Sequence, residues 1–485
     1  MQFSPSAPSA VLARASSVNR REVLRLAGAA LAYGGAVPAR PQTSRPRKVI
    51  IAGAGIAGLC CGYELLKRGH EVTVLEASGR AGGHVWTFRD QLPDGFYVDA
   101  GAEHFTQPGY DICWQYIQEF NLRPLGYPKR ENYIRFMDGK MYTDEMLADA
   151  QVVKGFGFNQ REVDYIVRHG WNNFSALFLG SYIDRIRDEY QPFGVGLDAL
   201  DDVPLSEVIR KEGASEAAVE FLGGSGSALQ AIYEDAILKL RGVPSYPTKV
   251  YRIEGGNQRL PDMLAAKLGE RVRLGSPVAA IEHGASGVTV TYEERGEKKK
   301  IEGDYLVCCM SAVMLRRIPV QPAWPESKAF AIANMPYYFA TRPIFVSQSR
   351  FWEKDGIKPD MSFGDPALGH IWRLGEDVDS PRGLLAGTSV ATTTAEQALA
   401  AYRRYYPGKH EDIAQTWVVE WSKNPWAGAC ERIGYKVGEL RKYWPHVFEP
   451  QGRVHFAGAY ADNLGWGMEA ATRSAHRVVK AIDGA

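Results

Sequence analysis

The fold is decided by one stretch, Lys48-Val49-Ile50-Ile51-Ala52-Gly53-Ala54-Gly55-Ile56-Ala57-Gly58. An apolar strand runs into three glycines spaced G-x-G-x-x-G, and an amphipathic segment from Leu59 to Arg68 follows. A second apolar strand over residues 72–75 then ends at Glu76. Strand, glycine turn, helix, strand and acid, in this order, are typical of a dinucleotide-binding unit. A chance match in a glycine-rich chain is the alternative, and the flanking elements count against it.

Each residue of the motif has a physical task. Gly53 permits the tight turn, Gly55 lets backbone approach a pyrophosphate, and Gly58 lets the helix pack on the strand. The N–H groups of Ile56 and Ala57 lie at the helix N-terminus, where the positive end of the helix dipole attracts phosphate. The motif therefore predicts an α/β, Rossmann-like domain.

A second glycine pair follows the acid, in Ala77-Ser78-Gly79-Arg80-Ala81-Gly82-Gly83-His84. Glu76 is placed to accept a hydrogen bond from a ribose hydroxyl. The added glycines bring more backbone close to the same ligand, which a nicotinamide dehydrogenase does not need. We therefore expect the ligand to contact residues of this segment, namely Glu76, Ala77, Arg80, Gly82, Gly83 and His84.

The C-terminal region carries a second, independent motif. Residues 453–460, Arg-Val-His-Phe-Ala-Gly-Ala-Tyr, predict a buried strand and a glycine turn. Gly465-Trp466-Gly467-Met468-Glu469-Ala470-Ala471 then opens a final helix that we expect to run to about Ile482. An ordinary amphipathic C-terminal helix is the plainer alternative.

Composition limits the classes of function. With 485 residues, 45% of them hydrophobic, the chain is long enough for two or more domains. A formal net charge of +1 gives no electrostatic reason to expect nucleic acid or an anionic membrane as a partner. The six cysteines show no C-x-x-C spacing, so we expect buried thiols and no metal site.

The N-terminal 45 residues have the pattern of an export signal. Asn19-Arg20-Arg21-Glu22 contains an arginine pair, and a stretch of small and apolar residues runs from Leu26 to Val37. This predicts a twin-arginine signal and linker over residues 1–45, and a periplasmic or secreted protein. A tail with two arginines by chance, on a cytoplasmic protein, is the alternative.

Together, these motifs resemble those of the flavin amine oxidase family. Its FAD-binding start is an acid followed by R-x-G-G-R, and its closing signature is F-A-G-E, then G-W/Y-M-E-G-A and a helix. Here His84 replaces the last arginine and Ala459 replaces the glutamate. Within the family, the chain is most similar to bacterial L-amino acid oxidases with twin-arginine signals. The resemblance implies FAD as the cofactor and a homodimer.

The resemblance also implies a division of the chain. The FAD-binding domain is expected to be discontinuous, with segments 46–106, 249–330 and 445–485. A substrate domain of mixed sheet and helix is expected from residues 107–248 and 331–444. Val278 would bind adenine through its backbone, the alternative being plain sheet core.

The activity implied is oxidative deamination of an L-amino acid, with hydride transfer from its α-carbon to flavin N5. The products are a 2-oxo acid, ammonia and hydrogen peroxide, and O2 is the second substrate. A monoamine or polyamine oxidase, a flavin desaturase or protoporphyrinogen oxidase-like enzyme, and a non-catalytic FAD-binding protein are the alternatives.

Family positions imply which residues meet the flavin and the substrate. His104 occupies the place of an arginine that binds the substrate carboxylate in animal amino acid oxidases. Arg135 or Trp372 is the alternative ligand of that carboxylate. Trp466 would form an aromatic wall, and Tyr233 would line the substrate side-chain pocket. The flavin would contact Gly101, Ala102, Glu103, Trp421, Gly458, Ala459, Met468 and Glu469.

Two departures from the family concern the chemistry. Arg342 stands where many members have a lysine, nine residues before Phe351-Trp352. Either Arg342 holds a water by hydrogen bonding, or the lysine's role is absent, because arginine stays charged. Cys430 lies nine residues after Trp421, the spacing of a flavin-linked cysteine, with a buried free thiol as the alternative. Glu431, if it faces the pocket, would favour a basic substrate side chain.

Overall fold

The computed structural model describes residues 45–127, 130, 134–338, 340–355, 360–389, 392–406, 408–409, 412–429, 431–432 and 434–485. Residues 45–485 form one compact unit. The predicted export signal and Cys430 lie outside the described residues, as does the side chain of Glu431.

A five-stranded parallel sheet stands at the centre of the unit. Its strand order is β10 (Val272–Arg273), β2 (Glu71–Leu75), β1 (Lys48–Ala52), β14 (Tyr305–Cys308) and β23 (Val454–Phe456). Parallel sheets are covered on both faces, and β1 is accordingly buried from Val49 to Ala52. The α/β, Rossmann-like fold predicted from the motif is confirmed.

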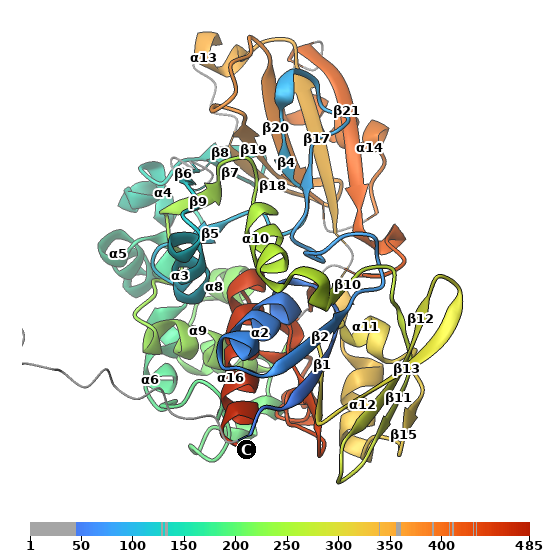
Figure 1. Cartoon of the computed structure of the whole chain (residues 1–485). Coiled ribbons are helices and arrows are strands. Elements are labelled where there is room, and N and C mark those ends of the chain that lie inside the picture. The colour runs from blue at the N-terminus through green and yellow to red at the C-terminus, as the bar shows by residue number, and fades with distance from the viewer. Residues whose placement is uncertain are drawn as a thin grey trace, which may run out of the picture. The chain divides into compact units, whose positions relative to one another are not determined.

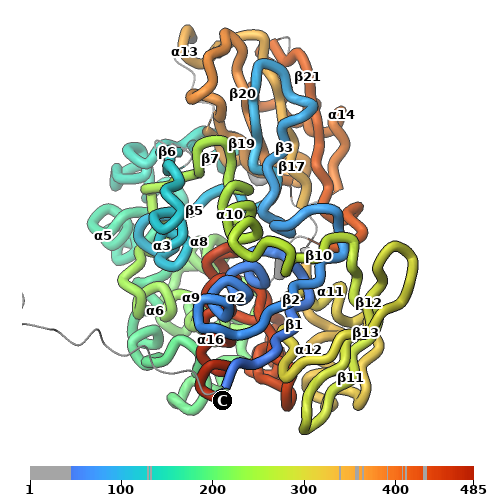
Figure 2. The backbone as a smooth tube through the Cα atoms, viewed as in Figure 1, coloured from blue at the N-terminus to red at the C-terminus, as the bar shows by residue number. Residues whose placement is uncertain are grey.

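Helices cover one face of this sheet. They are α2 (Ile56–Lys67), α10 (Arg259–Leu268) and α16 (Gly467–Asp483). Val49 and Ile51 pack with these helices, whereas Ile50 and Ala52 point into the core on the opposite face. Figures 1 and 2 show α2, near the start of the described chain, beside α16 at its end.

The turn between β1 and α2 is closed so tightly that one position admits no side chain. A Cβ atom at Gly58 would lie 2.0 Å from the carbonyl oxygen of Gly53. The helix therefore approaches the end of the strand at backbone distance, as the glycine spacing predicted.

A four-stranded sheet lies beside the parallel sheet (Figure 1). Its order is β13 (Glu297–Gly303), β12 (Val288–Glu294), β11 (Val278–His283) and β15 (Val320–Gln321), and β12 pairs with β13 as an antiparallel hairpin. The short helices α11 (Ala312–Leu315) and α12 (Glu326–Asn334) follow β14.

A seven-stranded sheet forms another layer, at the top of Figure 1. Its order is β21 (Ile413–Glu420), β17 (Thr341–Ser347), β20 (Gly383–Thr388), β19 (Leu368–Leu374), β18 (Met361–Asp365), β7 (Ile134–Met137) and β8 (Lys140–Tyr142). The strands β7 and β8 pair with each other, and β7 joins the sheet by pairing with β18. The accompanying helices are α13 (Phe351–Asp355) and α14 (Ala395–Tyr405).

The longer elements between β5 and β9 are helices. Its helices are α3 (Asp111–Glu119), α4 (Ala150–Lys154), α5 (Gln160–His169), α6 (Ala176–Ile183), α7 (Leu205–Lys211), α8 (Glu216–Leu222) and α9 (Ala228–Leu240), and α15 (Leu440–Tyr443) lies later in the chain. A three-stranded sheet has the order β5 (Phe105–Thr106), β9 (Val250–Ile253) and β6 (Pro124–Gly126). Two further sheets have two strands each, β3 (Thr87–Phe88) with β4 (Val98–Asp99) and β16 (Tyr337–Tyr338) with β22 (Glu431–Arg432).

Two further findings concern the described residues. Cys60, Cys61, Cys113, Cys308 and Cys309 form no disulfide and, apart from the half-buried Cys309, are buried. A search of the described helices finds none with both the length and the apolarity needed to cross a membrane.

The closed turn yields a stability prediction. Gly58→Ala should destabilise the fold by about 3 kcal/mol, because the added methyl group would clash with backbone that cannot rotate away. Thermal unfolding of the variant measures the loss. Gly284→Ala is the matched control, since a Cβ atom at Gly284 meets nothing within 4 Å. Equal unfolding temperatures for the two variants would contradict the assignment.

A buried histidine yields a pH prediction. Burial and the nearby Arg477 lower the pKa of His455 from 6.5 to about 4. Between pH 6.5 and pH 4, His455 is protonated in the unfolded chain and neutral in the folded chain. The free energy of unfolding therefore decreases as the pH falls towards 4. His455→Phe should remove about 2 kcal/mol of the stability lost between pH 7 and pH 5. Urea unfolding of both proteins at the two pH values tests this, and parallel losses would refute it.

Candidate functional site

A cavity of about 1000 Å³ opens at the carboxyl ends of the central parallel strands. Its wall includes Gly53 after β1, Glu76 after β2, Cys309 after β14 and Gly458 after β23. Ligands of open α/β sheets bind at this edge, because loops and helix N-termini converge there.

The two glycine loops predicted to hold a dinucleotide meet in the cavity wall. Gly55 and Gly82 form a parallel bridge, and the Gly82 N–H donates to the carbonyl of Ala54 at 2.8 Å. A Cβ atom at Gly55 would meet no protein atom within 4 Å, so the space before the N-terminus of α2 is open. Ile56 and Ala57 line the same space, which suits a pyrophosphate.

Glu76 holds this part of the site together. Its Oε2 accepts a hydrogen bond from the Ala54 N–H at 2.7 Å, and its Oε1 accepts from the N–H and the hydroxyl of Ser78 at 2.8 Å each. A carboxylate has about four acceptor positions, so Glu76 keeps capacity for a ribose hydroxyl.

Arg80 supplies positive charge beside the glycine pair. Its guanidinium donates to the carbonyls of Gly83 at 2.6 Å and Ala81 at 3.2 Å, and it lies over the Trp86 ring. Burial lowers the pKa of Arg80, while the nearby Glu76 opposes that shift. Arg80 remains a cation near the expected phosphates.

His84, which replaces the family arginine, contributes a ring and no charge. Its imidazole stacks on Trp421 with ring centroids 4.4 Å apart, and its Nε2 lies 2.8 Å from the carbonyl oxygen of Ala429. Burial lowers the pKa of His84, so the neutral ring donates an N–H to that carbonyl. Gly101 permits this stacking, because a Cβ there would lie 1.8 Å from the His84 carbonyl oxygen.

The C-terminal motif forms another part of the wall. Gly458, Ala459, Trp466 and Met468 line the cavity, and α16 directs its N-terminus at it. Trp466 stacks on Tyr110 with centroids 5.5 Å apart. The positive end of the α16 dipole favours negative charge on a group bound here.

Of the predicted cofactor residues, Gly58 and Glu469 do not line the cavity. Glu469 is fully buried and accepts hydrogen bonds from the N–H groups of Ile112 and Cys113, both at 3.1 Å. Its carboxylate therefore caps the N-terminus of α3 and ties α16 to that helix. The other predicted cofactor positions are in the wall: Gly53, Gly55, Ile56, Ala57, Glu76, Ala77, Arg80, Gly82, Gly83, His84, Gly101, Ala102, Glu103, Val278, Trp421, Gly458, Ala459, Trp466 and Met468.

A cluster of charged groups lies in another part of the wall. Arg342 donates to the Thr388 hydroxyl at 2.6 Å and lies 3.7 Å from Glu103. Glu103 is also 3.2 Å from Nδ1 of His104. The negative charge of Glu103 thus has basic groups on two sides, and Arg342 is committed to local partners.

Arg130 also lines the cavity, and sequence reasoning missed it. Its guanidinium donates to the Pro247 carbonyl at 2.9 Å, lies 3.3 Å from Nε2 of His104 and sits over the Tyr246 ring. None of the described carboxylates lies within ion-pair distance of it. It follows β6 in the chain, and no motif or apolar periodicity of the sequence marks it.

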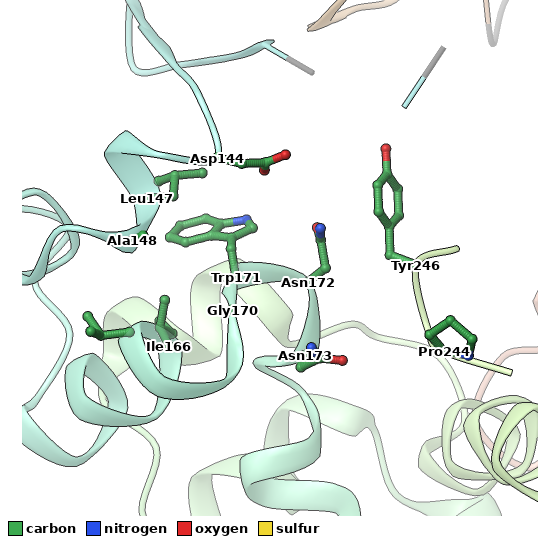
Figure 3. A pocket seen from close by; sticks show the side chains of 11 residues that line it. Asp144, Leu147, Ala148, Ile166, Gly170, Trp171, Asn172, Asn173, Pro244 and Tyr246 are labelled. Atoms are coloured by element: carbon green, nitrogen blue, oxygen red, sulfur yellow. The ribbon is translucent and has the colours of Figure 1, made fainter. Parts of the chain in front are cut away.

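A smaller cavity of about 210 Å³ is lined in part by Tyr246, the residue whose ring lies against Arg130. Figure 3 shows Asp144, Trp171 and Asn172 facing Tyr246 across it. Arg135, proposed as an alternative carboxylate ligand, donates to Asp144 at 2.6 Å and to Asn172 at 3.1 Å. Arg135 is thus held at this smaller cavity and is not in the wall of the larger one.

Trp372 and Tyr233 are not brought to the large cavity. Trp372 is buried beneath Arg342, whose guanidinium lies 5.0 Å from its ring, while His370 on the same strand reaches the wall. Tyr233 points into the core and donates to the Glu189 carbonyl at 2.6 Å. Its neighbour Glu234 lines the cavity instead.

The glycine loops, the carboxylate of Glu76 and the guanidinium of Arg80 fit a flavin dinucleotide. Among the described residues, no group of three histidine, cysteine, aspartate or glutamate side chains has the arrangement of a metal site. Residues 56–483 match the sequence family described as flavin-containing amine oxidoreductases.

The chain belongs to this family.

Similar proteins in the family include snake enzymes. An L-amino acid oxidase of Bothrops pictus is 31% identical over 472 residues, covering 89% of this chain and 90% of the relative. The L-amino-acid oxidase of Pseudechis australis is 27% identical over 458 residues, covering 88% and 84%. The resemblance to L-amino acid oxidases is thus confirmed, with relatives from snakes rather than bacteria.

Solved structures of the family share the fold. A putrescine oxidase triple mutant superposes with a TM-score of 0.76 at 20% identity, covering 90% of this chain and 98% of that one. The cyclohexylamine oxidase of Brevibacterium oxydans gives a TM-score of 0.73 at 21% identity, covering 91% and 99%. At this identity the likeness concerns the fold alone.

The open space before α2 yields a test of flavin binding. Gly55→Ala should leave the fold intact, because the new methyl group meets no protein atom. It should weaken FAD binding at least roughly tenfold, because the methyl group occupies the position of the pyrophosphate. The ratio of flavin to protein absorbance, with circular dichroism as the folding control, measures both. Full flavin content in the variant would place the pyrophosphate elsewhere.

Proposed function

We propose that this chain is an FAD-dependent L-amino acid oxidase. It would convert an L-amino acid, O2 and water into a 2-oxo acid, ammonia and hydrogen peroxide. The observation that carries the proposal is Arg130, a guanidinium in the cavity wall with no described carboxylate in ion-pair contact. An amino acid brings the carboxylate that such a group binds, and a simple amine does not.

The residues of the wall suit this substrate. Arg130 and the adjacent His104 would hold the α-carboxylate, with the Pro247 carbonyl fixing the guanidinium. The stacked pair of Tyr110 and Trp466 would form a flat wall beside the amino group and exclude water from it.

The redox chemistry would come from the cofactor. Bound FAD would accept the α-hydrogen and two electrons as a hydride, and transfer of two electrons and two protons to O2 would give hydrogen peroxide. The substrate amine loses a proton as the C=N bond forms, and water hydrolyses the imino acid to the 2-oxo acid and ammonia. Orienting the α-carbon is the protein's contribution, and it requires both a clamp and a wall.

The similar proteins support an amino acid, rather than a simple amine, as the substrate. The similar snake proteins that cover most of the chain are L-amino acid oxidases, at 27–31% identity. A monoamine or polyamine oxidase is the rival within the family, and the amine oxidases of similar fold are only 20–21% identical.

Two statements about the whole protein are also part of the proposal. The arginine pair Arg20-Arg21 followed by an apolar stretch supports export by the twin-arginine route. The family resemblance supports a homodimer, which light scattering of the purified protein would test.

Arg130→Met tests the function directly. Loss of the carboxylate clamp should lower kcat/KM for L-amino acids by roughly 100-fold or more, mainly through KM. Oxidation of an amine that lacks the carboxylate should be unchanged or improved. Peroxide release by the flavin-loaded proteins measures both.

Arg123→Met is the matched control, because Arg123 is exposed and pairs with Glu254 away from the cavity. Equal losses in the two variants would argue against the clamp. Turnover of amines alone by the wild-type protein would replace the proposal with an amine oxidase.

A further inference from the structure

The backbone at Gly109 lies against the edge of the Trp466 ring. A Cβ atom at Gly109 would be 2.1 Å from Cζ3 and 2.9 Å from Cη2 of that ring. Both distances are well inside van der Waals contact, so a side chain at this position would displace the ring. Gly109 is buried and is not in the wall of the large cavity, whereas Trp466 is part of that wall.

The backbone conformation at Gly109 is a second reason for a glycine. Its φ of +120° lies in the region that residues with a side chain rarely adopt. The contact with Trp466 and the backbone conformation are thus two separate requirements. Only the contact connects Gly109 to the cavity, so the two requirements predict different effects on activity.

The turn that carries Gly109 is held in place by hydrogen bonds from two side chains. The Thr106 hydroxyl donates to the carbonyl of Pro108 at 2.8 Å. Arg241, just after α9, donates to the carbonyl of Gly109 at 3.1 Å and to Asp111 at 2.8 Å. Moving this backbone away from the ring would break these hydrogen bonds, so the turn cannot easily make room for a side chain.

The start of α16 is held to the same turn. Arg241 also donates to Glu469 at 3.2 Å. Glu469 is fully buried and belongs to the first turn of α16, the helix that begins directly after Trp466. One guanidinium therefore ties the turn at Gly109 to the helix start at Trp466.

The Trp466 ring is held on a face as well as on an edge. Its face stacks on Tyr110, with ring centroids 5.5 Å apart and an angle of 13° between the planes. Tyr110 follows Gly109 directly, so the same turn supplies both contacts. The orientation of the ring in the cavity wall is therefore determined by these two neighbouring residues.

We propose that Gly109 is a positioning residue of the active site, which holds the Trp466 ring where the α-carbon of the substrate has to pack. The proposal rests on the amino acid oxidase function above, in which Trp466 forms a wall beside the amino group.

This role concerns the rate of the reaction more than the affinity for the substrate. Displacing the wall would misplace the α-hydrogen relative to the flavin, and a misplacement of about 1 Å costs roughly 100-fold in rate. Arg130, the proposed clamp of the carboxylate, has its contacts with other segments of the chain. KM should therefore depend less on Gly109 than kcat does.

Gly109→Ala tests the position of the ring. In the flavin-loaded protein it should lower kcat by roughly 10- to 100-fold for the L-amino acid that the wild-type protein oxidises fastest, with KM changed less than roughly threefold. Peroxide release measures both constants, and anaerobic bleaching of the bound flavin measures the rate of its reduction by the substrate.

Gly296→Ala is the matched control for backbone strain. Gly296 has a φ of +82° in the exposed turn between β12 and β13, and a Cβ atom there would meet nothing within 4 Å. This variant should keep the kcat of the wild-type protein.

Trp466→Phe separates the contact from the backbone strain. Phenylalanine lacks the second ring with its atoms Cζ3 and Cη2, so it leaves room for a methyl group at residue 109. Made in the Trp466→Phe protein, Gly109→Ala should lower kcat by less than roughly threefold, because the effects of residues in contact are not additive. The double variant should also regain part of the unfolding temperature that Gly109→Ala alone loses.

The outcomes decide between contact and strain. Equal losses of kcat from Gly109→Ala in the wild-type and Trp466→Phe proteins would overturn the role of Gly109, because backbone strain acts in both. If Gly109→Ala does not fold, a folded double variant supports the contact with Trp466, and failure of both to fold overturns it. Oxidation of amines without any amino acid would overturn the oxidase function instead, and the same set of variants assayed with an amine would still decide the role of Gly109.

Discussion

The site depends on one close contact, in which α2 meets the end of β1 with no room for a side chain. A Cβ at Gly58 would sit 2.0 Å from the Gly53 carbonyl oxygen, so the helix N-terminus reaches the strand edge itself. The second glycine loop can then form its bridge between Gly55 and Gly82. Because four of the five parallel strands end around the same space, this contact determines where a dinucleotide can lie.

A second coupling joins the cofactor wall to the substrate wall. Glu469, near the start of α16, caps α3 through the N–H groups of Ile112 and Cys113 and lies 3.2 Å from Arg241. Burial raises the pKa of Glu469, and the N–H donors and Arg241 offset part of that shift. One buried carboxylate thereby fixes α16, α3 and the end of α9 relative to each other. It acts through these elements without touching the cavity.

The sequence was most informative where geometry is local. Glycine spacing and strand-helix order placed nearly every predicted cofactor residue in the cavity wall, because backbone approach depends on neighbours in the chain. The substrate side was less predictable. Arg130 belongs to no sequence motif, and its position depends on contacts with His104 and Pro247, which are far away in the sequence. For Glu234 a clue existed, since the apolar spacing of residues 228–240 places Tyr233 in the core and its neighbour outside it.

The departures from the family motif change how charge is distributed along the cavity. With a neutral His84 stacked on Trp421, the charge that the family arginine would carry is absent from this point. Arg80 and the N-terminus of α2 are then the main attraction for phosphate. Arg342 gives its charge to Glu103, so it adds little net field. Arg130 also lines the wall, and none of the described carboxylates lies within ion-pair distance of it, so an acidic group on a bound molecule is what this part of the wall would orient.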